Sequence, residues 1–131
     1  LFLKESNRIL KKGGYLIITT PNLCAWFNRV LMPLGIQPLF LEPSTKSKLV
    51  GAGFLKKFKQ DPWPVGHIRI FTLAALQDML FMYGFRPVAV KGANYDEGFP
   101  SSVLWFDNLF TAFPKLAAHL VIVARKVKDA S

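Results

Sequence analysis

Two histidines and one cysteine are the scarcest reactive side chains in this sequence, so candidates for acid–base or nucleophilic chemistry are few. His67 lies in a segment that leads into a predicted helix. Because imidazole titrates near neutral pH, His67 is the best candidate for a catalytic general base. The alternative is a histidine whose hydrogen bonds fix the start of that helix. His119 lies in an apolar segment and is expected to be structural, and Cys24 has no base near it in the sequence.

Three other residues are candidates for holding a substrate. Asn22 directly follows a predicted strand, at the end where ligands bind in open α/β sheets, although a turn-forming role would also explain it. Arg69 is suited to an anionic group or to a local salt bridge. Trp26, with Phe27 and Trp63, would form an apolar lid over a site or pack within the fold.

Motifs for several other chemistries are absent from the sequence. The only G-x-G, at residues 51–53, follows no predicted strand and has Lys56 where a dinucleotide loop places its third glycine. Neither G-x-S-x-G nor H-E-x-x-H occurs, so hydrolase and zinc-peptidase functions lack support. One cysteine and two histidines cannot supply four zinc ligands, and no metal site is expected.

The composition is that of one globular domain with a basic surface. At 131 residues and 51% hydrophobic residues, the chain is long and apolar enough to bury a core, which excludes a disordered protein. The net charge is +9, and five lysines fall in a stretch without an acid between Glu42 and Asp61. They are Lys46, Lys48, Lys56, Lys57 and Lys59. This stretch favours an anionic partner or is simply a solvated basic loop.

Cysteine usage and hydropathy also restrict where the protein works. A single cysteine cannot form an internal disulfide, which favours a reduced, cytoplasmic protein. No apolar run reaches the length of about 18 residues that a membrane span requires. The apolar stretch 23–41 followed by the lysines nevertheless suggests a lipid-like acceptor or peripheral contact with an anionic membrane. The alternative is a lid that packs within the protein.

Hydrophobic periodicity predicts an α/β chain in three parts. Residues 1–22 form an amphipathic helix and a strand, and the lack of alternation over 15–20 predicts that this strand is buried on both faces. Residues 23–66 form an insertion or lid, with helices expected over 25–31 and 46–55. Residues 67–131 form a helix over 72–83 capped by Thr72, a strand over 85–91, a helix over 103–113 and a strand over 116–125. Pro87 argues against a central position for the strand that contains it.

In this order, the segments resemble the carboxyl-terminal half of class I S-adenosylmethionine-dependent methyltransferases. Residues 2–22 are similar to the helix ending "R-x-L-K-P-G-G" and the strand ending "T-P-N", with Lys12 in place of the proline. Residues 66–72 resemble "G-H-x-R-x-F-[ST]", and residues 83–85 and 120–126 resemble the later "G-F" segment and the last strand. The resemblance covers essentially the whole sequence, although each motif alone is degenerate.

The resemblance implies a Rossmann-like sheet of which this chain supplies three mixed strands, the fifth, sixth and seventh, with flanking helices. The last strand would lie antiparallel between the other two. In such enzymes the first four strands hold S-adenosylmethionine, and none of their binding motifs has a matching position in this sequence. No cofactor-binding residue is therefore assigned, and the chain is expected to be a truncated domain.

The function implied by the resemblance is methyl transfer to a small-molecule or lipid-like acceptor, with this chain inactive by itself. His67 would be the base, and Asn22, Trp26 and Arg69 would contact the acceptor. An alternative is a non-catalytic interaction module that forms a homodimer through the edge of the strand at 15–20. A basic nucleic-acid-binding domain is the weakest reading, because the lysines match no known binding motif.

Overall fold

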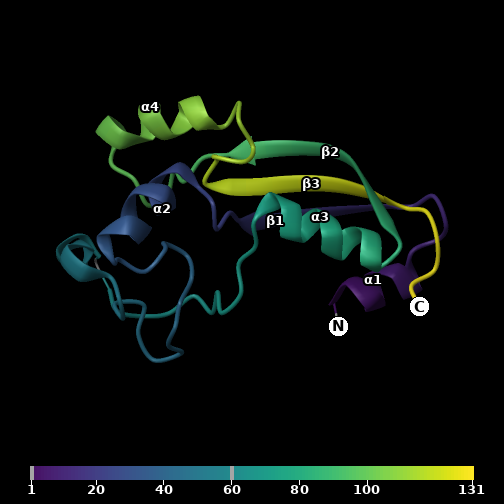
Figure 1. Ribbon diagram of the computed structural model, residues 1–131, viewed down its shortest axis with the longest axis horizontal. Coiled ribbons are helices and arrows are strands. Elements are labelled where there is room, and N and C mark those ends of the chain that lie inside the picture. Colours follow the sequence, from purple (N-terminus) through teal and green to yellow (C-terminus); the bar gives the residue numbers. More distant parts are fainter. Residues whose placement is uncertain (1, 60) are drawn as a thin grey trace.

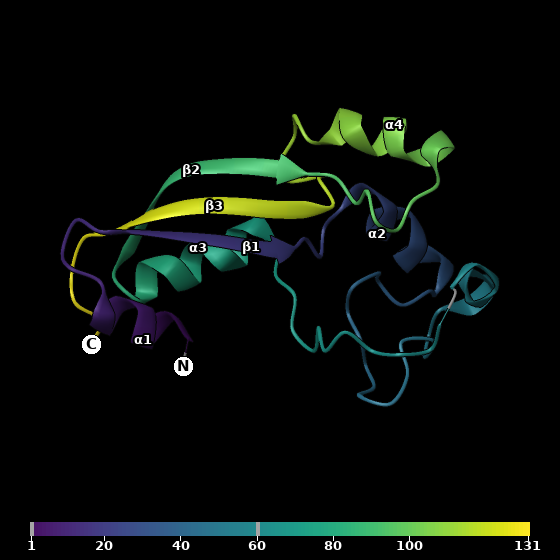
Figure 2. The same cartoon turned by 180° about the vertical axis from the view of Figure 1, so that it is seen from behind.

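The computed structural model describes residues 2–59 and 61–131, and it confirms the expected α/β class (Figure 1). Its helices and strands follow one another in the order α1 Phe2–Ile9, β1 Tyr15–Pro21, α2 Trp26–Leu31, α3 Leu73–Met82, β2 Phe85–Ala93, α4 Ser101–Phe110 and β3 His119–Lys126. Two short 3₁₀ helices, Met32–Leu34 and Gly53–Phe58, lie between α2 and α3. The chain ends and α1 lie at one end of the molecule, and α2 and α4 lie at the other (Figures 1 and 2).

The three strands form one sheet in the order β1-β3-β2. β3 runs antiparallel to both neighbours, with Tyr15 opposite Arg125 and Phe85 opposite Lys126. The expected position of the last strand, antiparallel between the other two, is confirmed. Both ladders are antiparallel, because β3 separates β1 and β2, the two strands that run in the same direction.

Local signals placed α3 and β2 correctly. The Thr72 hydroxyl accepts a hydrogen bond from the backbone N–H of Ala75 at 3.1 Å, and the helix begins at the next residue as predicted. Pro87 lies in an edge strand and beside a shift in the ladder, as expected of a residue without an N–H donor. The helix expected over 46–55 is wrong. Gly51 and Gly53 have positive φ angles there, and a 3₁₀ helix begins only at Gly53.

The prediction that the first strand is buried on both faces is also wrong. Leu16 and Ile18 pack against the core, but Tyr15 is exposed and Ile17 is 66% exposed. β1 is an edge strand, and the described part of the chain covers only one of its faces. Apolar and polar residues do not alternate in this strand because its outer face is apolar as well. The sequence pattern therefore showed that both faces are hydrophobic, not that both are buried.

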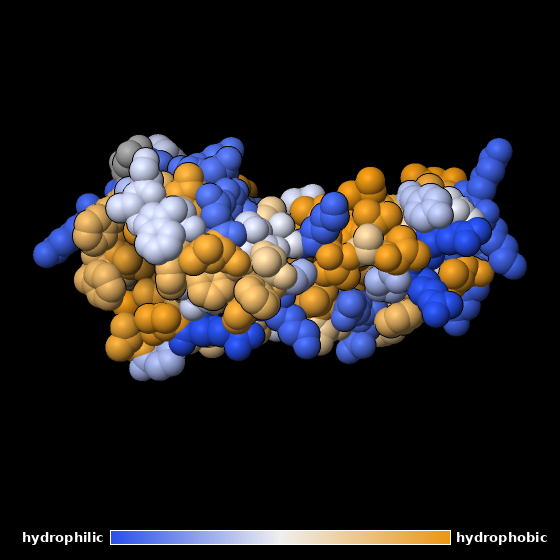
Figure 3. Space-filling view, turned by 90° about the horizontal axis from the view of Figure 1, so that it is seen from above, coloured by the Kyte–Doolittle hydropathy of each residue, from blue (hydrophilic) through white to orange (hydrophobic). Residues whose placement is uncertain are grey.

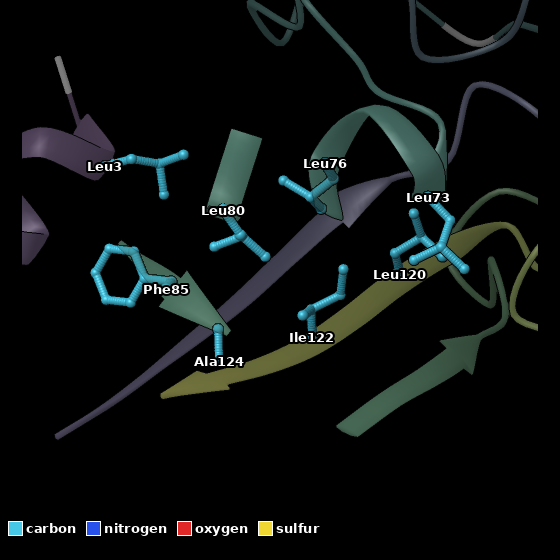
Figure 4. Packing of buried hydrophobic residues seen from close by; sticks show 8 residues of the cluster. All are labelled: Leu3, Leu73, Leu76, Leu80, Phe85, Leu120, Ile122 and Ala124. Carbon is cyan, nitrogen blue, oxygen red and sulfur yellow. The ribbon is translucent and has the colours of Figure 1, made fainter. Parts of the chain in front are cut away.

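The main core lies between α3 and the sheet (Figure 4). Leu73, Leu76 and Leu80 of α3 point toward alternate residues of β3. The buried cluster consists of Leu3, Leu73, Leu76, Leu80, Phe85, Leu120, Ile122 and Ala124. Because the buried residues of β3 are two apart, the central strand presents one apolar face to the helix.

Polar contacts hold α1 to the carboxyl-terminal tail. The Asn7 carboxamide donates to the carbonyls of Tyr83 and Lys128 at 2.7 and 2.9 Å and accepts from Ala130 N–H at 3.1 Å. The buried Lys126 ammonium donates to the carbonyls of Asn7 and Leu10 at 2.7 and 3.0 Å. A cation at the carboxyl end of a helix is favoured by the helix dipole, so Lys126 stabilises the carboxyl end of α1.

Among the residues that the structure describes, none of the helices combines the length and apolarity needed to cross a bilayer.

Candidate functional site

A cavity of about 660 Å³ lies at the carboxyl ends of β1 and β2. Thr19 and Ala93 contribute from the ends of these strands, and His119 contributes from the start of β3. The insertion between α2 and α3 and the loop after β2 form the remaining walls. Ligands of open α/β sheets bind at this end of the strands, which makes the cavity the candidate site.

Glu42 holds the loop that carries His67. Its carboxylate accepts hydrogen bonds from the backbone N–H groups of Val65, Gly66 and His67 at 2.9, 2.7 and 3.1 Å. Its own N–H donates to the His67 carbonyl at 3.0 Å. Burial raises the pKa of Glu42, but the three backbone donors and the nearby His67 outweigh it and leave the pKa below its ordinary value. The three backbone N–H groups of the loop therefore stabilise the charged form of the Glu42 carboxylate.

Two of the five clustered lysines belong to the cavity. The Lys48 ammonium pairs with Asp61 at 2.9 Å, and the Lys59 ammonium donates to the Lys48 carbonyl at 2.8 Å. Burial lowers the pKa of Lys59, and the positive charge of Lys48 lowers it further, while Glu42 opposes the shift. The Lys48 hydrogen bond lowers the pKa of Asp61. Lys48 and Lys59 are thus wall residues, whereas the other three lysines are exposed.

Aromatic rings form the wall nearest the sheet. Phe40 meets Tyr95 edge to face with ring centres 4.6 Å apart, and His119 lies 5.0 Å from Phe40. The His119 ring nitrogen Nδ1 is 3.0 Å from the Asn94 carbonyl. Burial raises the pKa of Tyr95, Glu97 raises it further and Lys48 opposes the shift. The phenol therefore stays protonated and able to donate a hydrogen bond at neutral pH.

Phe40 has an unusual backbone conformation. Its φ of 73° lies in the left-handed region, and within the described ranges the other residues with positive φ are glycines. The strain is held by packing, because its ring also meets Phe27 at 5.8 Å. Strained residues persist where the surroundings fix them, often beside a functional site, and Phe40 lies at the wall of this cavity.

Of the four predicted site residues, His67 lines the cavity and the other three lie outside its lining. Asn22 is fully buried: its amide donates to the carbonyls of Lys115 and Ala117 at 3.2 and 2.8 Å, and its oxygen accepts from Cys24 N–H at 3.0 Å. Its hydrogen-bonding groups are used to hold the turn after β1, the alternative that the sequence left open.

The two remaining candidates also lie away from the cavity wall. Trp26 donates through Nε1 to Asp107 at 2.7 Å and stacks on Phe110 with ring centres 5.5 Å apart, so it joins α2 to α4. Arg69 is exposed. Trp63, the expected partner of Trp26 and Phe27 in a lid, is also largely exposed.

Sequence reasoning missed Glu42, Lys59 and Tyr95 as wall residues. Glu42 contacts His67 across 25 residues of chain, and Tyr95 comes from the loop after β2. No local motif marks either of them. The one available signal was that Glu42 is the acid preceding a long basic stretch. In the described ranges, no group of three or more histidine, cysteine, aspartate or glutamate side chains is arranged to hold a metal.

The arrangement offers an imidazole, an ammonium group of lowered pKa and a phenol around an aromatic wall. These groups suit a ligand with both a polar part and an apolar part. Comparisons with protein-family models, with curated proteins and with solved structures found no match to this chain.

Proposed function

We propose that this chain is the acceptor-binding part of an S-adenosylmethionine-dependent methyltransferase and that the cavity at the ends of β1 and β2 receives the acceptor. One observation carries the proposal: His67, the base expected from the resemblance, lines a cavity at the strand ends where ligands of such sheets bind. The strand order β1-β3-β2 agrees with the same resemblance.

The residues present do not make a site for the cofactor. A nucleoside cofactor is held by a glycine-rich turn after a strand and by an acid on the ribose. The turn after β1 begins at Asn22 instead, and the Asn22 side chain is already hydrogen bonded within the chain. The proposal therefore assigns S-adenosylmethionine to a cofactor-binding half joined to this chain, and the fragment alone is inactive.

The cavity residues have distinct roles in this proposal. His67 takes the proton of an acceptor whose attacking atom carries one, and Glu42 fixes the loop that presents it. Charged side chains of both signs, among them Lys59 and Glu97, contact a polar group of the acceptor, while Phe40 and Tyr95 contact its apolar part. Methyl transfer requires alignment of the acceptor, which the cavity walls supply. The acceptor class is a small or lipid-like molecule with a polar group.

The test is calorimetric titration of S-adenosylhomocysteine into two proteins. One is this chain, and the other is the same chain extended by the residues encoded upstream of it. Binding by the extended form alone supports the proposal. If neither protein binds S-adenosylhomocysteine, the methyltransferase proposal is wrong and an interaction module is favoured.

The second candidate is that interaction module, and the exposed edge of β1 favours it. Tyr15 and Ile17 lie uncovered on an edge strand, which can pair with another strand. This candidate predicts a homodimer that the substitution Ile17→Lys dissociates, measured by sedimentation velocity. A chain that sediments as a monomer at tens of micromolar contradicts it.

A further inference from the structure

Helix α4 carries large apolar residues on two sides. On the inner side Phe106 and Phe110 pack on Trp26, and the acid Asp107 is fully enclosed. On the outer side Trp105 is 61% exposed and Leu109 is 56% exposed, and Phe113, just after the helix, is 61% exposed. A surface helix normally presents polar residues on its outer side, so the exposed apolar stripe needs an explanation.

The cause is a set of hydrogen bonds to the buried acid. One Asp107 carboxyl oxygen accepts from Trp26 Nε1 at 2.7 Å, and the other accepts from the backbone N–H of Tyr95 at 2.6 Å. Turning α4 to bury its apolar stripe would remove the acceptor from both part-buried donors, which is costly. The outward direction of the apolar stripe is therefore fixed by the fold.

The exposed stripe forms a continuous apolar surface. Trp105, Leu109 and Phe113 are four residues apart, which places them along one side of the helix and its last turn. Figure 3 shows apolar side chains gathered on the face seen from above, the side on which α4 lies in Figure 1. Because a patch of several large exposed apolar side chains marks an interaction site, the stripe is a candidate binding surface.

The charge of the chain and of the residues beside the stripe indicates the class of partner. Apart from the enclosed Asp107, the only charged residue from 100 to 116 is Lys115, beside the stripe. An anionic surface attracts a chain of net charge +9. Aromatic and aliphatic side chains flanked by basic ones are the composition that binds at a bilayer interface.

We propose that α4 docks this chain on the surface of a bilayer that contains anionic phospholipids. Trp105, Leu109 and Phe113 enter the interface, and Lys115 contacts the head groups. The inference is independent of methyl transfer, because it rests on the orientation of α4 and on charge rather than on the cavity.

The test is co-flotation of the chain with vesicles of phosphatidylcholine and phosphatidylglycerol, compared with vesicles of phosphatidylcholine alone. We expect binding to the anionic vesicles that weakens with added salt. The double variant Trp105→Ser/Phe113→Ser should lower the partition coefficient by at least about tenfold, because two aromatic rings no longer leave water. Circular dichroism checks that this variant remains folded, as expected of exposed positions.

The matched control is Phe81→Ser/Met82→Ser, which removes two comparably exposed apolar side chains from α3. Its partition coefficient should stay within about twofold of that of the unmodified chain. The proposal is overturned if the unmodified chain does not float with anionic vesicles or if the α4 variant binds as tightly as the control. It is also overturned if sedimentation shows a dimer that Trp105→Ser/Phe113→Ser dissociates, because the stripe would then bind a second copy.

Discussion

Different interactions stabilise the two ends of the molecule. At the sheet end, aliphatic side chains of α3 and β3 such as Leu80 and Ile122 are fully enclosed. At the other end, the buried cluster is small and aromatic rings surround it, with Phe27 at its centre. Enclosed polar side chains, Asn28 and Asp107, make the remaining connections there. One end depends on apolar burial and the other on directed hydrogen bonds.

This difference bears on the two hollows of the molecule. The aliphatic end has an apolar hollow of about 200 Å³ lined by residues of α1, β1 and α3, whereas the rings and hydrogen-bonded loops of the other end surround a wider one of about 660 Å³. The Asn28 carboxamide shows how the second end is built: its oxygen accepts from Leu39 N–H at 2.7 Å and its nitrogen donates to the Leu23 carbonyl at 3.0 Å. Such contacts fix loops without filling the volume between them, which leaves room for the wider hollow at this end.

The largest effect is expected from Leu80→Ala. This fully enclosed residue packs in the main core, and its truncation should lower the free energy of unfolding by about 3 kcal/mol. Urea denaturation measures the change. Phe81→Ala, at a residue 54% exposed on the same helix, should cost less than about 1 kcal/mol. Equal losses for the two variants would mean that the core does not lie under α3.

The next effect is expected from Asp107→Ala, which leaves the Trp26 indole and the Tyr95 N–H without their acceptor. The free energy of unfolding should fall by about 2 kcal/mol. Asp107→Asn keeps one oxygen acceptor and should lose less. If Asp107→Ala is as stable as the unmodified chain in urea denaturation, then polar contacts do not hold the α2–α4 end.

A smaller and local effect is expected from Glu42→Gln. The neutral amide is a weaker acceptor for the three backbone donors, so the amides of Val65, Gly66 and His67 should exchange with solvent about tenfold faster. Hydrogen exchange followed by NMR measures this. Glu97→Gln changes the charge of another cavity acid and should leave these three amides unaffected.

The smallest effect is a dependence of the same loop on pH. The folded pKa of Glu42 lies below its ordinary value of 4.5, so its stabilising contribution is present above that value. The contribution is lost as the pH falls through the folded pKa. Amide chemical shifts of Val65 and Gly66 should therefore titrate below pH 4.5 in the unmodified chain and not in Glu42→Gln. A titration that persists in the variant would assign the transition to another acid.

The same contrast sets how much the sequence could predict. Thr72 and the apolar spacing of α3 are local, and β3 is an uninterrupted apolar run, so these elements and their class follow from short stretches. The face of α4 that points inward is decided by Trp26, 81 residues away, and the loop of His67 is decided by Glu42. The cavity depends on such distant hydrogen bonds, for which periodicity carries no signal. Tyr15 and Ile17 show the converse, because apolar residues were predicted to be buried and nothing in the described chain covers them.

The position of β3 also determines when the fold can form during synthesis. Within residues 2–59 and 61–131, β1 and β2 pair only with β3, which follows both of them in the chain. Asn7 in α1 finds its partners Lys128 and Ala130 more than 120 residues later. As the chain leaves the ribosome, its earlier elements therefore wait unpaired until the last strand emerges, with their apolar surface exposed to chaperones and to neighbouring chains.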